Sequence, residues 1–280
     1  MGIAVNHLLC FGFGYSARAL SAPLAGWKIS ATSRSAEGVA KINAHGASGF
    51  LFDQNFKIAP DTTHVLISAP PDENGDPVLR VCGDQLRSRQ FTWVGYLSTT
   101  GVYGDAQGKW VDEDSPLKPN TPRGEKRLHA ERAWLQAQPA HLFRLAGIYG
   151  PGRNQLLSVR DGGAKRIIKA GQIFSRIHVD DIAGVLQASI ARPNPGRAYN
   201  ACDDEPCPPQ DVVAYAARLL NLPLPPEIPF DEAKLSPMAR SFYADSKKVS
   251  NARVKTELGY KFLYPTYREG LAALLPTLTA

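Results

Sequence analysis

Residues 7–20 read HLLCFGFGYSARAL, and this stretch carries the strongest indication of the fold. An apolar run typical of a buried strand leads into Gly12-x-Gly14-x-x-Ala17, and a helix-like segment follows. A tight turn requires Gly12, close approach of a diphosphate requires Gly14, and close packing of helix on strand requires a small residue at Ala17. The stretch predicts a dinucleotide-binding turn, and its alternative is a plain strand-to-helix connection.

After this turn, short apolar runs alternate with polar, helix-like runs over the first two hundred or so residues. We expect strands at 7–12, 27–32, 49–52, 64–68, 92–97, 141–145 and 197–202. We expect helices at 15–25, 35–45, 76–88, 121–138 and 181–191. Several of the strands are almost continuously apolar, as strands buried on both faces are. The alternation predicts an α/β fold, with a Rossmann-type, doubly wound parallel sheet.

Two domains are expected from the distribution of these elements. Residues 1–150 and about 177–202 are predicted to form the dinucleotide-binding Rossmann domain. The rest of the chain is richer in proline, as in PCPPQ and NLPLPPEIP. We therefore expect a small substrate-binding lobe at about 151–176 and 203–280.

The bulk properties restrict the classes of function. The chain has 280 residues, is 44% hydrophobic and carries a net charge of +6, which favours an anionic small-molecule substrate or cofactor. Its basic residues are scattered, so nucleic acid is not an expected partner. No apolar run is long enough to span a membrane, and the first residues do not resemble a signal peptide. Four cysteines without a CxxC pair favour reduced thiols and a cytoplasmic location.

The choice of nucleotide depends on the end of the second expected strand. An acidic residue about twenty positions after the glycines would bind the ribose hydroxyls of NAD. Here that region holds Thr32, Ser33 and Arg34, which would instead bind a 2′-phosphate. We therefore expect NADP as cofactor, with NAD as the alternative; Arg34 could also be a solvated loop residue. Asp53 could accept a hydrogen bond from the adenine amino group, or could simply form a turn.

Further motifs follow the glycine turn in order. They are LISAPP (66–71), LSTTGVYGD (97–105), RLAGIYGPGRN (144–154), RIHVDDIAGVLQASI (176–190) and ADSKKVSNARVKTELGY (244–260). Together with the glycine turn they resemble the extended short-chain dehydrogenase/reductase superfamily, in its epimerase/dehydratase branch. The resemblance spans almost the whole chain, and the order and spacing of the motifs make it specific at the level of the superfamily.

The resemblance implies a nicotinamide cofactor lying across the ends of the strands. The turn residues Gly12, Gly14, Tyr15, Ser16 and Ala17 would bind it, and the loop Ser68, Ala69 and Pro70 would run along it. The resemblance also implies a homodimer. It places Thr99 where a hydroxyl would donate to the reacting oxygen, although such a hydroxyl could equally satisfy a strand-end backbone group.

The family's catalytic Tyr and Lys, four residues apart, have no counterpart in the stretch TPRGEKRLHAE (121–131). The resemblance places Arg123 at the Tyr position and Arg127 at the Lys position. A guanidinium stays protonated, so neither arginine can act as a general acid. Arg127 could still bind the ribose or a cofactor phosphate, and Arg123 could bind an anionic substrate. Tyr103 could donate the proton, although packing beneath its loop is the stronger alternative.

Two further arginines flank the expected substrate cleft. Arg153 and Arg176 could each bind a phosphate or carboxylate, and surface solvation is the default for both. Between Arg176 and the next helix, His178 is followed by Asp180 and Asp181. We expect one of these aspartates to cap that helix and expect no metal.

These observations leave two main hypotheses for the function. The first is an NADP-dependent oxidoreductase or epimerase-like enzyme with a non-standard acid, acting on a small polar or anionic substrate such as a nucleotide sugar. The second is a non-catalytic NADP-binding redox sensor or regulator. A nucleic-acid-associated protein is a weaker third hypothesis, which a steep salt dependence of DNA binding would support.

Overall fold

The computed structural model describes residues 5–278, so the outermost residues of the expected domains, 1–4 and 279–280, lie outside the described chain. The chain divides into two compact units. Unit 1 runs up to Thr99 and includes Glu125–Arg144 and Ile182–Tyr199, and unit 2 comprises Thr100–Gly124, Leu145–Asp181 and the chain from Asn200 onward. The functional domain boundaries expected from the sequence stay a prediction.

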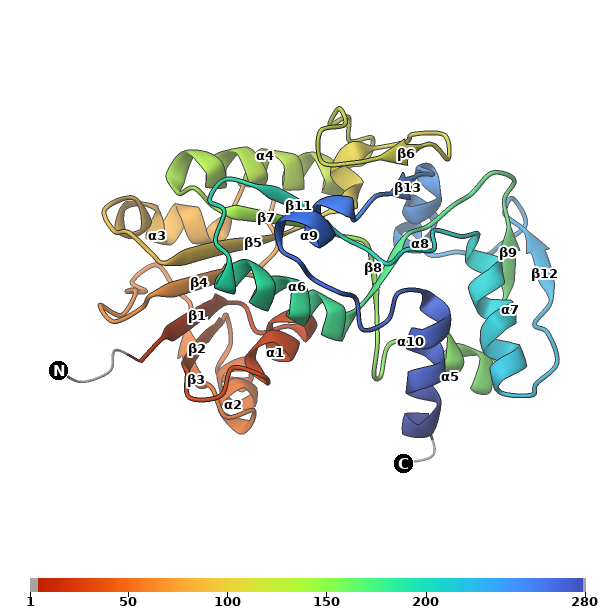
Figure 1. Ribbon diagram of the computed structural model, residues 1–280, viewed down its shortest axis with the longest axis horizontal. Helices are drawn as coiled ribbons and strands as arrows, with labels where there is room; N and C mark the ends of the chain where they lie inside the picture. Colours follow the sequence, from red (N-terminus) through yellow and green to blue (C-terminus); the bar gives the residue numbers. More distant parts are fainter. Residues whose placement is uncertain (1–4, 279–280) are drawn as a thin grey trace. The chain divides into compact units, whose positions relative to one another are not determined.

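A seven-stranded sheet organises unit 1 (Figure 1). Its strands are β1 (His7–Phe11), β2 (Lys28–Ser33), β3 (Ser48–Leu51), β4 (His64–Ile67), β5 (Trp93–Thr99), β7 (His141–Leu145) and β11 (Ala198–Ala201), in the order β11-β7-β5-β4-β1-β2-β3. β1 pairs in parallel with both β2 and β4. The chain leaves β1 in one direction and later continues from β4 in the other, which confirms the doubly wound α/β sheet. Such folds bind ligands outside the carboxyl ends of the strands at this reversal.

Helices connect these strands and cover the sheet. They are α1 (Tyr15–Ser21), α2 (Ala36–Ala44), α3 (Pro77–Arg87), α4 (Pro122–Ala137) and α6 (Val179–Ala191). α3 and α4 pack on one face, where Val78, Leu86 and Trp134 join alternate residues of β1, β4 and β5 in a buried cluster. On the opposite face, Trp93 Nε1 donates to Ser189 Oγ of α6 over 3.0 Å. The apolar residues whose spacing predicted these strands and helices are thus the residues that pack on the two faces of the sheet.

Unit 2 is built from shorter elements. Its helices are α5 (Gln155–Arg160), α7 (Pro209–Leu219), α8 (Pro237–Ser241), α9 (Ala252–Glu257) and α10 (Tyr267–Leu274), with 3-10 turns η1 (Thr100–Tyr103), η2 (Phe242–Ala244) and η3 (Leu275–Leu278). Its strands are β6 (Trp110–Val111), β8 (Gly147–Tyr149), β9 (Arg166–Ile168), β10 (Arg176–His178), β12 (Glu227–Pro229) and β13 (Lys248–Val249). They form three separate parallel pairs, β10-β8, β12-β9 and β13-β6.

These short strands were not expected from the sequence, because two or three residues are too few to show a periodic pattern. Apolar side chains of α5, α7 and α10 form the main core of unit 2, with Leu156, Val212 and Leu271 buried together. All four cysteines are free and buried. Within residues 5–278, no helix combines the length and apolar character that crossing a membrane requires.

Candidate functional site

The glycine turn after β1 has the geometry that the motif predicts. Gly12 has φ of +84°, and a Cβ there would lie 3.2 Å from the backbone nitrogen of Ala69. The amides of Ser68 and Ala69 both donate to the carbonyl of Phe11, over 3.0 and 2.8 Å. Gly12 N donates to Thr32 Oγ1 over 3.2 Å. These bonds hold the turn against the ends of β2 and β4, in a conformation that glycine adopts without strain.

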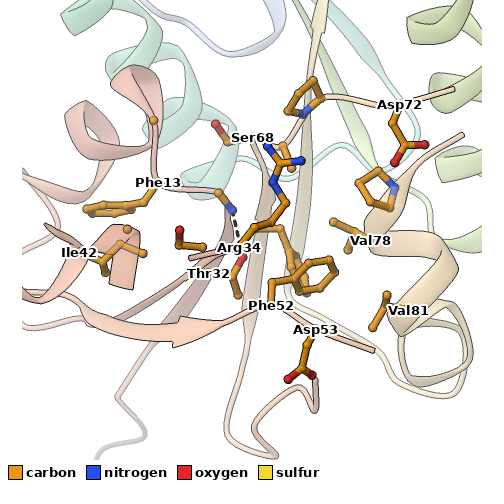
Figure 2. A pocket seen from close by; sticks show the side chains of 18 of the residues that line it. Phe13, Thr32, Arg34, Ile42, Phe52, Asp53, Ser68, Asp72, Val78 and Val81 are labelled. Atoms are coloured by element: carbon orange, nitrogen blue, oxygen red, sulfur yellow. Dashed lines mark hydrogen bonds between the residues drawn. The ribbon is translucent and has the colours of Figure 1, made fainter. Parts of the chain in front are cut away.

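A cavity of about 710 Å³ opens within unit 1 beside this turn, at the carboxyl ends of β1, β2 and β4 (Figure 2). Many of the expected cofactor-binding residues line it, namely Gly12, Gly14, Ser33, Arg34, Asp53, Ser68, Ala69 and Pro70. Others do not: Ser16 and Ala17 are buried in α1, and neither they nor Tyr15 line the cavity. The structure therefore brings together residues that lie up to about sixty positions apart in the sequence, at the reversal of strand order.

Four cations line the cavity, and they differ in how they are paired. Arg80 donates to both carboxylate oxygens of Asp72, over 2.8 and 2.7 Å. Lys41 pairs with Glu37 over 2.6 Å, and Arg18 contacts His45 Nε2 at 3.3 Å. Arg34 is exposed and, within residues 5–278, makes no hydrogen bond or ion pair (Figure 2). Its guanidinium is thus available to an anionic ligand.

The acidic residues of the cavity are engaged locally. The Arg80 hydrogen bond holds the pKa of Asp72 below its usual range, and the charge of Arg34 contributes to this. Asp53 Oδ1 accepts from the amide of Asn55 over 2.8 Å, which is the turn geometry that the sequence left as an alternative. Asp53 nevertheless lines the cavity, so its adenine contact stays a prediction.

Sequence reasoning missed the other charged residues of the cavity, Arg18, Lys41, Asp72 and Arg80. They lie on α1, α2, the loop after β4 and α3. Arg18 could have been found, because it follows Gly14 by one helical turn and therefore faces the same end of the sheet. The remaining three carry no motif, and only the packing of α2 against β2 and β3, and of α3 against the face of β4, directs them to the cavity.

The α4 arginines make contacts within their own units. Thr121 Oγ1 accepts from the amide of Gly124 over 3.1 Å and so caps the start of the helix. Arg127 Nη1 donates to the carbonyl of Leu97 over 2.6 Å and to the Tyr96 hydroxyl over 3.1 Å. Arg127 thus faces β5. Arg123 lies over the Phe242 ring in unit 2, 5.6 Å from its centroid. Their expected roles in binding cofactor and substrate stay predictions.

The two expected catalytic residues lie at the end of β5 and in η1. Thr99 is partly buried. Tyr103 is 3% exposed, and its hydroxyl donates to Asn200 Oδ1 over 2.7 Å. The phenol proton is therefore engaged in a buried hydrogen bond, and using it in catalysis would require that bond to open. Whether Thr99 and Tyr103 act on a substrate stays a prediction.

The substrate arginines occupy different environments in unit 2. Arg153 is exposed, in a turn closed by two backbone hydrogen bonds with Gly150. Arg176 is 7% exposed, and its Nη1 donates to the carbonyl of Phe174 and contacts Cys207 Sγ, each at 3.2 Å. Arg176 is therefore not a solvated surface residue, in contrast to the default for arginine.

The expected helix cap after His178 is wrong. α6 begins at Val179, and the amide of Asp180 donates to His178 Nδ1 over 3.2 Å. The Asp181 carboxylate instead accepts from the Tyr260 hydroxyl and from the amides of Leu263 and Tyr264, over 2.8, 2.7 and 3.1 Å. These hydrogen bonds join residues 260–264, which follow α9, to the start of α6. The described residues contain no cluster of three or more His, Cys, Asp and Glu side chains suited to a metal.

Comparisons with known proteins agree with this geometry. No family model matches the chain. It is 27% identical over 269 residues to protein YeeZ of Escherichia coli K12, covering 88% of this chain and 91% of that protein. It is 30% identical over 182 residues, 58% of each chain, to a 3-diazoavenalumate denitrifying reductase of Streptomyces.

Solved structures extend the similarity to the whole chain. A functionally unknown conserved protein of Silicibacter pomeroyi is 56% identical, with a TM-score of 0.93 over 98% of this chain and 99% of that one. A candidate NAD-dependent epimerase/dehydratase of Methylobacillus flagellatus is 26% identical, with a TM-score of 0.74 over 99% and 100%. The human epimerase family protein SDR39U1, solved with NADPH, shares the fold at 16% identity, with a TM-score of 0.76 over 97% and 99%. The chain therefore has the NAD(P)-binding fold of the epimerase/dehydratase-like members of the extended short-chain dehydrogenase/reductase superfamily.

Proposed function

We propose that the unit 1 cavity binds NADP(H), and that the protein is an NADP-dependent oxidoreductase or epimerase-like enzyme acting on a small polar or anionic substrate. One observation carries the choice of nucleotide. Arg34, at the end of β2, is the cavity-lining cation that makes no ion pair or hydrogen bond within residues 5–278. An unpaired guanidinium attracts a phosphate strongly, because its donors match the phosphate oxygens in pairs.

The surroundings of Arg34 support this proposal. Ser33 Oγ accepts from the amide of Ser35 over 3.3 Å, so its hydroxyl is held at the start of α2. Gly38 leaves room for that hydroxyl, because a Cβ at position 38 would lie 1.9 Å from Ser33 Oγ. No carboxylate occupies the end of β2, where the residues are Ala31, Thr32 and Ser33. A 2′-phosphate would therefore meet a cation and a hydroxyl and no opposing charge on this strand.

The test is a titration of NADPH and NADH against the wild type and Arg34→Ala. Loss of charge-assisted hydrogen bonds worth about 1.5–3 kcal/mol should weaken NADPH binding about 10- to 100-fold and leave NADH binding unchanged. The control is Arg87→Ala, which removes the same charge from an arginine of α3 that pairs with Asp84. An unchanged preference in Arg34→Ala would refute the choice of NADP, and absence of binding by either nucleotide would refute the proposed cavity.

The similarity to a protein named as a reductase supports hydride transfer, and it covers 58% of this chain. A screen of carbonyl compounds and nucleotide sugars, followed by the absorbance of NADPH, tests for turnover. If Tyr103 supplies the proton, Tyr103→Phe should abolish turnover while leaving NADPH affinity unchanged. Activity that survives this substitution would remove Tyr103 from the mechanism.

A regulatory function is the second candidate, and two contacts favour it. The Tyr103 hydroxyl already donates to Asn200, and Arg127 already donates to Leu97 and Tyr96. Both side chains therefore have structural hydrogen bonds that do not need a substrate. Tight NADPH binding without turnover on any compound of the screen would support a cofactor-binding sensor over an enzyme.

A further inference from the structure

The loop between β4 and α3, residues 68–76, places one carboxylate in the wall of the unit 1 cavity. Pro70 and Pro71 restrict the backbone that leads to Asp72. Asp72 and Gly75 then exchange two backbone hydrogen bonds, of 2.9 and 3.3 Å, in a tight turn where Gly75 has φ of +95°. The turn therefore holds Asp72 in one place, and Asp72 lines the cavity (Figure 2).

The other two acidic side chains of this loop are engaged elsewhere. Glu73 pairs with Lys126 of α4. Asp76 is 5% exposed and accepts from two backbone amides at the start of α3, which it caps. Neither Glu73 nor Asp76 lines the cavity. Asp72 is therefore the carboxylate that this loop presents to a ligand in the cavity.

Arg80 of α3 holds the Asp72 carboxylate by both of its oxygens. Its Nη1 donates to Asp72 Oδ1 over 2.8 Å, and its Nη2 donates to Oδ2 over 2.7 Å. Nη1 also donates to the carbonyl of Gly75 over 3.3 Å, and the amide of Asn74 donates to Oδ1 over 2.8 Å. This paired geometry is the strong one for arginine and carboxylate. The ion pair adds no net charge to the cavity wall.

Arg34 reaches the same part of the cavity from the end of β2. Only β1 separates β2 from β4, so the carboxyl ends of these two strands lie about two strand spacings, or roughly 10 Å, apart. Figure 2 shows the Arg34 guanidinium in the part of the cavity that also holds Ser68 and Asp72. The Arg80 hydrogen bond lowers the pKa of Asp72, and the charge of Arg34 lowers it further. Two arginines thus act on one carboxylate, and one of them holds it.

We propose that Arg80 is a positioning residue for the choice of nucleotide: by holding Asp72, it keeps that carboxylate from pairing with Arg34 and leaves Arg34 to the 2′-phosphate. This inference rests on the proposed function, because it concerns the preference for NADPH over NADH. A carboxylate and a phosphate compete for one guanidinium, since both match its donors in pairs. The preference then depends on two arginines, one that binds the phosphate and one that restrains the competing carboxylate.

The test measures the Kd of NADPH and of NADH at low ionic strength, where charges are least screened. Arg80→Ala frees Asp72 to pair with Arg34, so it should weaken NADPH binding about 3- to 10-fold and change NADH binding less than about twofold. The two nucleotides differ only in the 2′-phosphate, so a distorted loop would weaken both. Arg87→Ala is the control, because Arg87 pairs with Asp84 on the same helix and does not line the cavity.

Two further variants separate positioning from direct binding of the phosphate by Arg80. Arg80→Ala combined with Asp72→Asn removes the competing charge together with its partner, so the preference for NADPH should return to within about twofold of the wild type. In an Arg34→Ala background, Arg80→Ala should change the ratio of the two Kd values less than about twofold, because the competition requires Arg34. If Arg80 binds the phosphate itself, neither result is obtained.

The outcomes distinguish this inference from the proposed function. A wild type that binds NADPH no more tightly than NADH would refute the choice of NADP, and this inference with it. A wild type that prefers NADPH would leave the proposed function standing. In that case an unchanged preference in Arg80→Ala, equal weakening of both nucleotides, or no recovery in the variant that also carries Asp72→Asn would each overturn the role of Arg80 alone.

Discussion

The two units differ in how completely their buried acidic side chains are hydrogen-bonded. In unit 1, Glu131 is 2% exposed and accepts from Ser98 Oγ, while Arg144 donates to both of its oxygens. Asp76 likewise accepts from two amides of α3 and from Trp134 Nε1. In unit 2, Asp203, Tyr149 and His178 keep unpartnered atoms within the described chain. Unit 1 is not free of such atoms, since Thr62 Oγ1 also has no partner among the described residues, but its buried carboxylates Glu131 and Asp76 are hydrogen-bonded, whereas Oδ2 of the buried Asp203 in unit 2 is not.

The buried pair of Glu131 and Arg144 in unit 1 tests this comparison with the largest expected effect. Replacing Glu131 with Leu leaves the Arg144 charge buried without its carboxylate, and we expect a loss of about 3–5 kcal/mol in the free energy of unfolding. Urea unfolding measures it. Asp84→Leu, which breaks the exposed pair with Arg87, is the control and should cost at most about 1 kcal/mol.

A second variant separates lost pairing from lost packing at the same place. Glu131→Leu combined with Arg144→Leu removes both charges, so most of the loss should be recovered. If Glu131→Leu lowers the free energy of unfolding no more than Asp84→Leu does, the pairing of buried charges does not distinguish unit 1 from unit 2.

The buried carboxyl of Asp203 in unit 2 predicts an unusual dependence of stability on pH. Burial raises the pKa of Asp203 to about 8, with Asp204 and Glu205 acting in the same direction and Arg176 opposing them. The unfolded carboxyl titrates near 4, so between about pH 4 and pH 8 the folded state retains a proton that the unfolded state has lost. Stability from this group should therefore fall as pH rises, by at most about 1.4 kcal/mol per pH unit.

Asp203→Asn checks that expectation. The variant should lose this part of the slope, so its free energy of unfolding relative to the wild type should be more favourable at pH 8 than at pH 5. Glu227→Gln serves as the control, because this side chain is paired with Arg166 near the surface and is not among the groups that act on Asp203. Parallel pH profiles for the wild type and Asp203→Asn would show that Asp203 is ionised in the fold like an ordinary carboxylate.

Unit 1 should show a smaller effect of the opposite sign. Burial lowers the pKa of His64 to about 4, and it also lowers the pKa values of His7 and His141. The unfolded imidazoles bind protons near 6.5, so this stability is present above that pH and is lost as pH falls toward 4. His64→Gln should reduce the acid slope by one proton. An unchanged slope would place the acid sensitivity elsewhere.

Much of unit 1 could be predicted from residues close together in the sequence. The glycine turn and the parallel strands follow from local periodicity and from the residue types that such turns require. Arg34 was also identified from its position after β2. Whether it is paired could not be predicted, because this depends on tertiary contacts: Arg80 pairs with Asp72, Lys41 with Glu37, and Arg18 contacts His45, so that Arg34 is the cavity-lining cation without a hydrogen bond or ion pair within residues 5–278.

The strand pairs and side-chain contacts of unit 2 could not be predicted, for a different reason. Its strand pairs join segments far apart in the chain, such as Lys248 with Trp110, and each is too short to carry a pattern. Asp181 looked like a helix cap because an aspartate near a helix start usually is one. Its carboxylate instead bonds to Tyr260, Leu263 and Tyr264, about eighty positions away.

The sequence by itself determined the class of fold and the end of the sheet at which a nucleotide would bind, because both depend on local spacing of glycines and apolar residues. Only the tertiary structure decided which polar groups meet. It turned Arg127 toward β5, engaged the Tyr103 hydroxyl and buried Asp203 beside Arg176. Hydrogen bonds and desolvation act between groups that are near in space, and nearness in space arises only when the chain has folded.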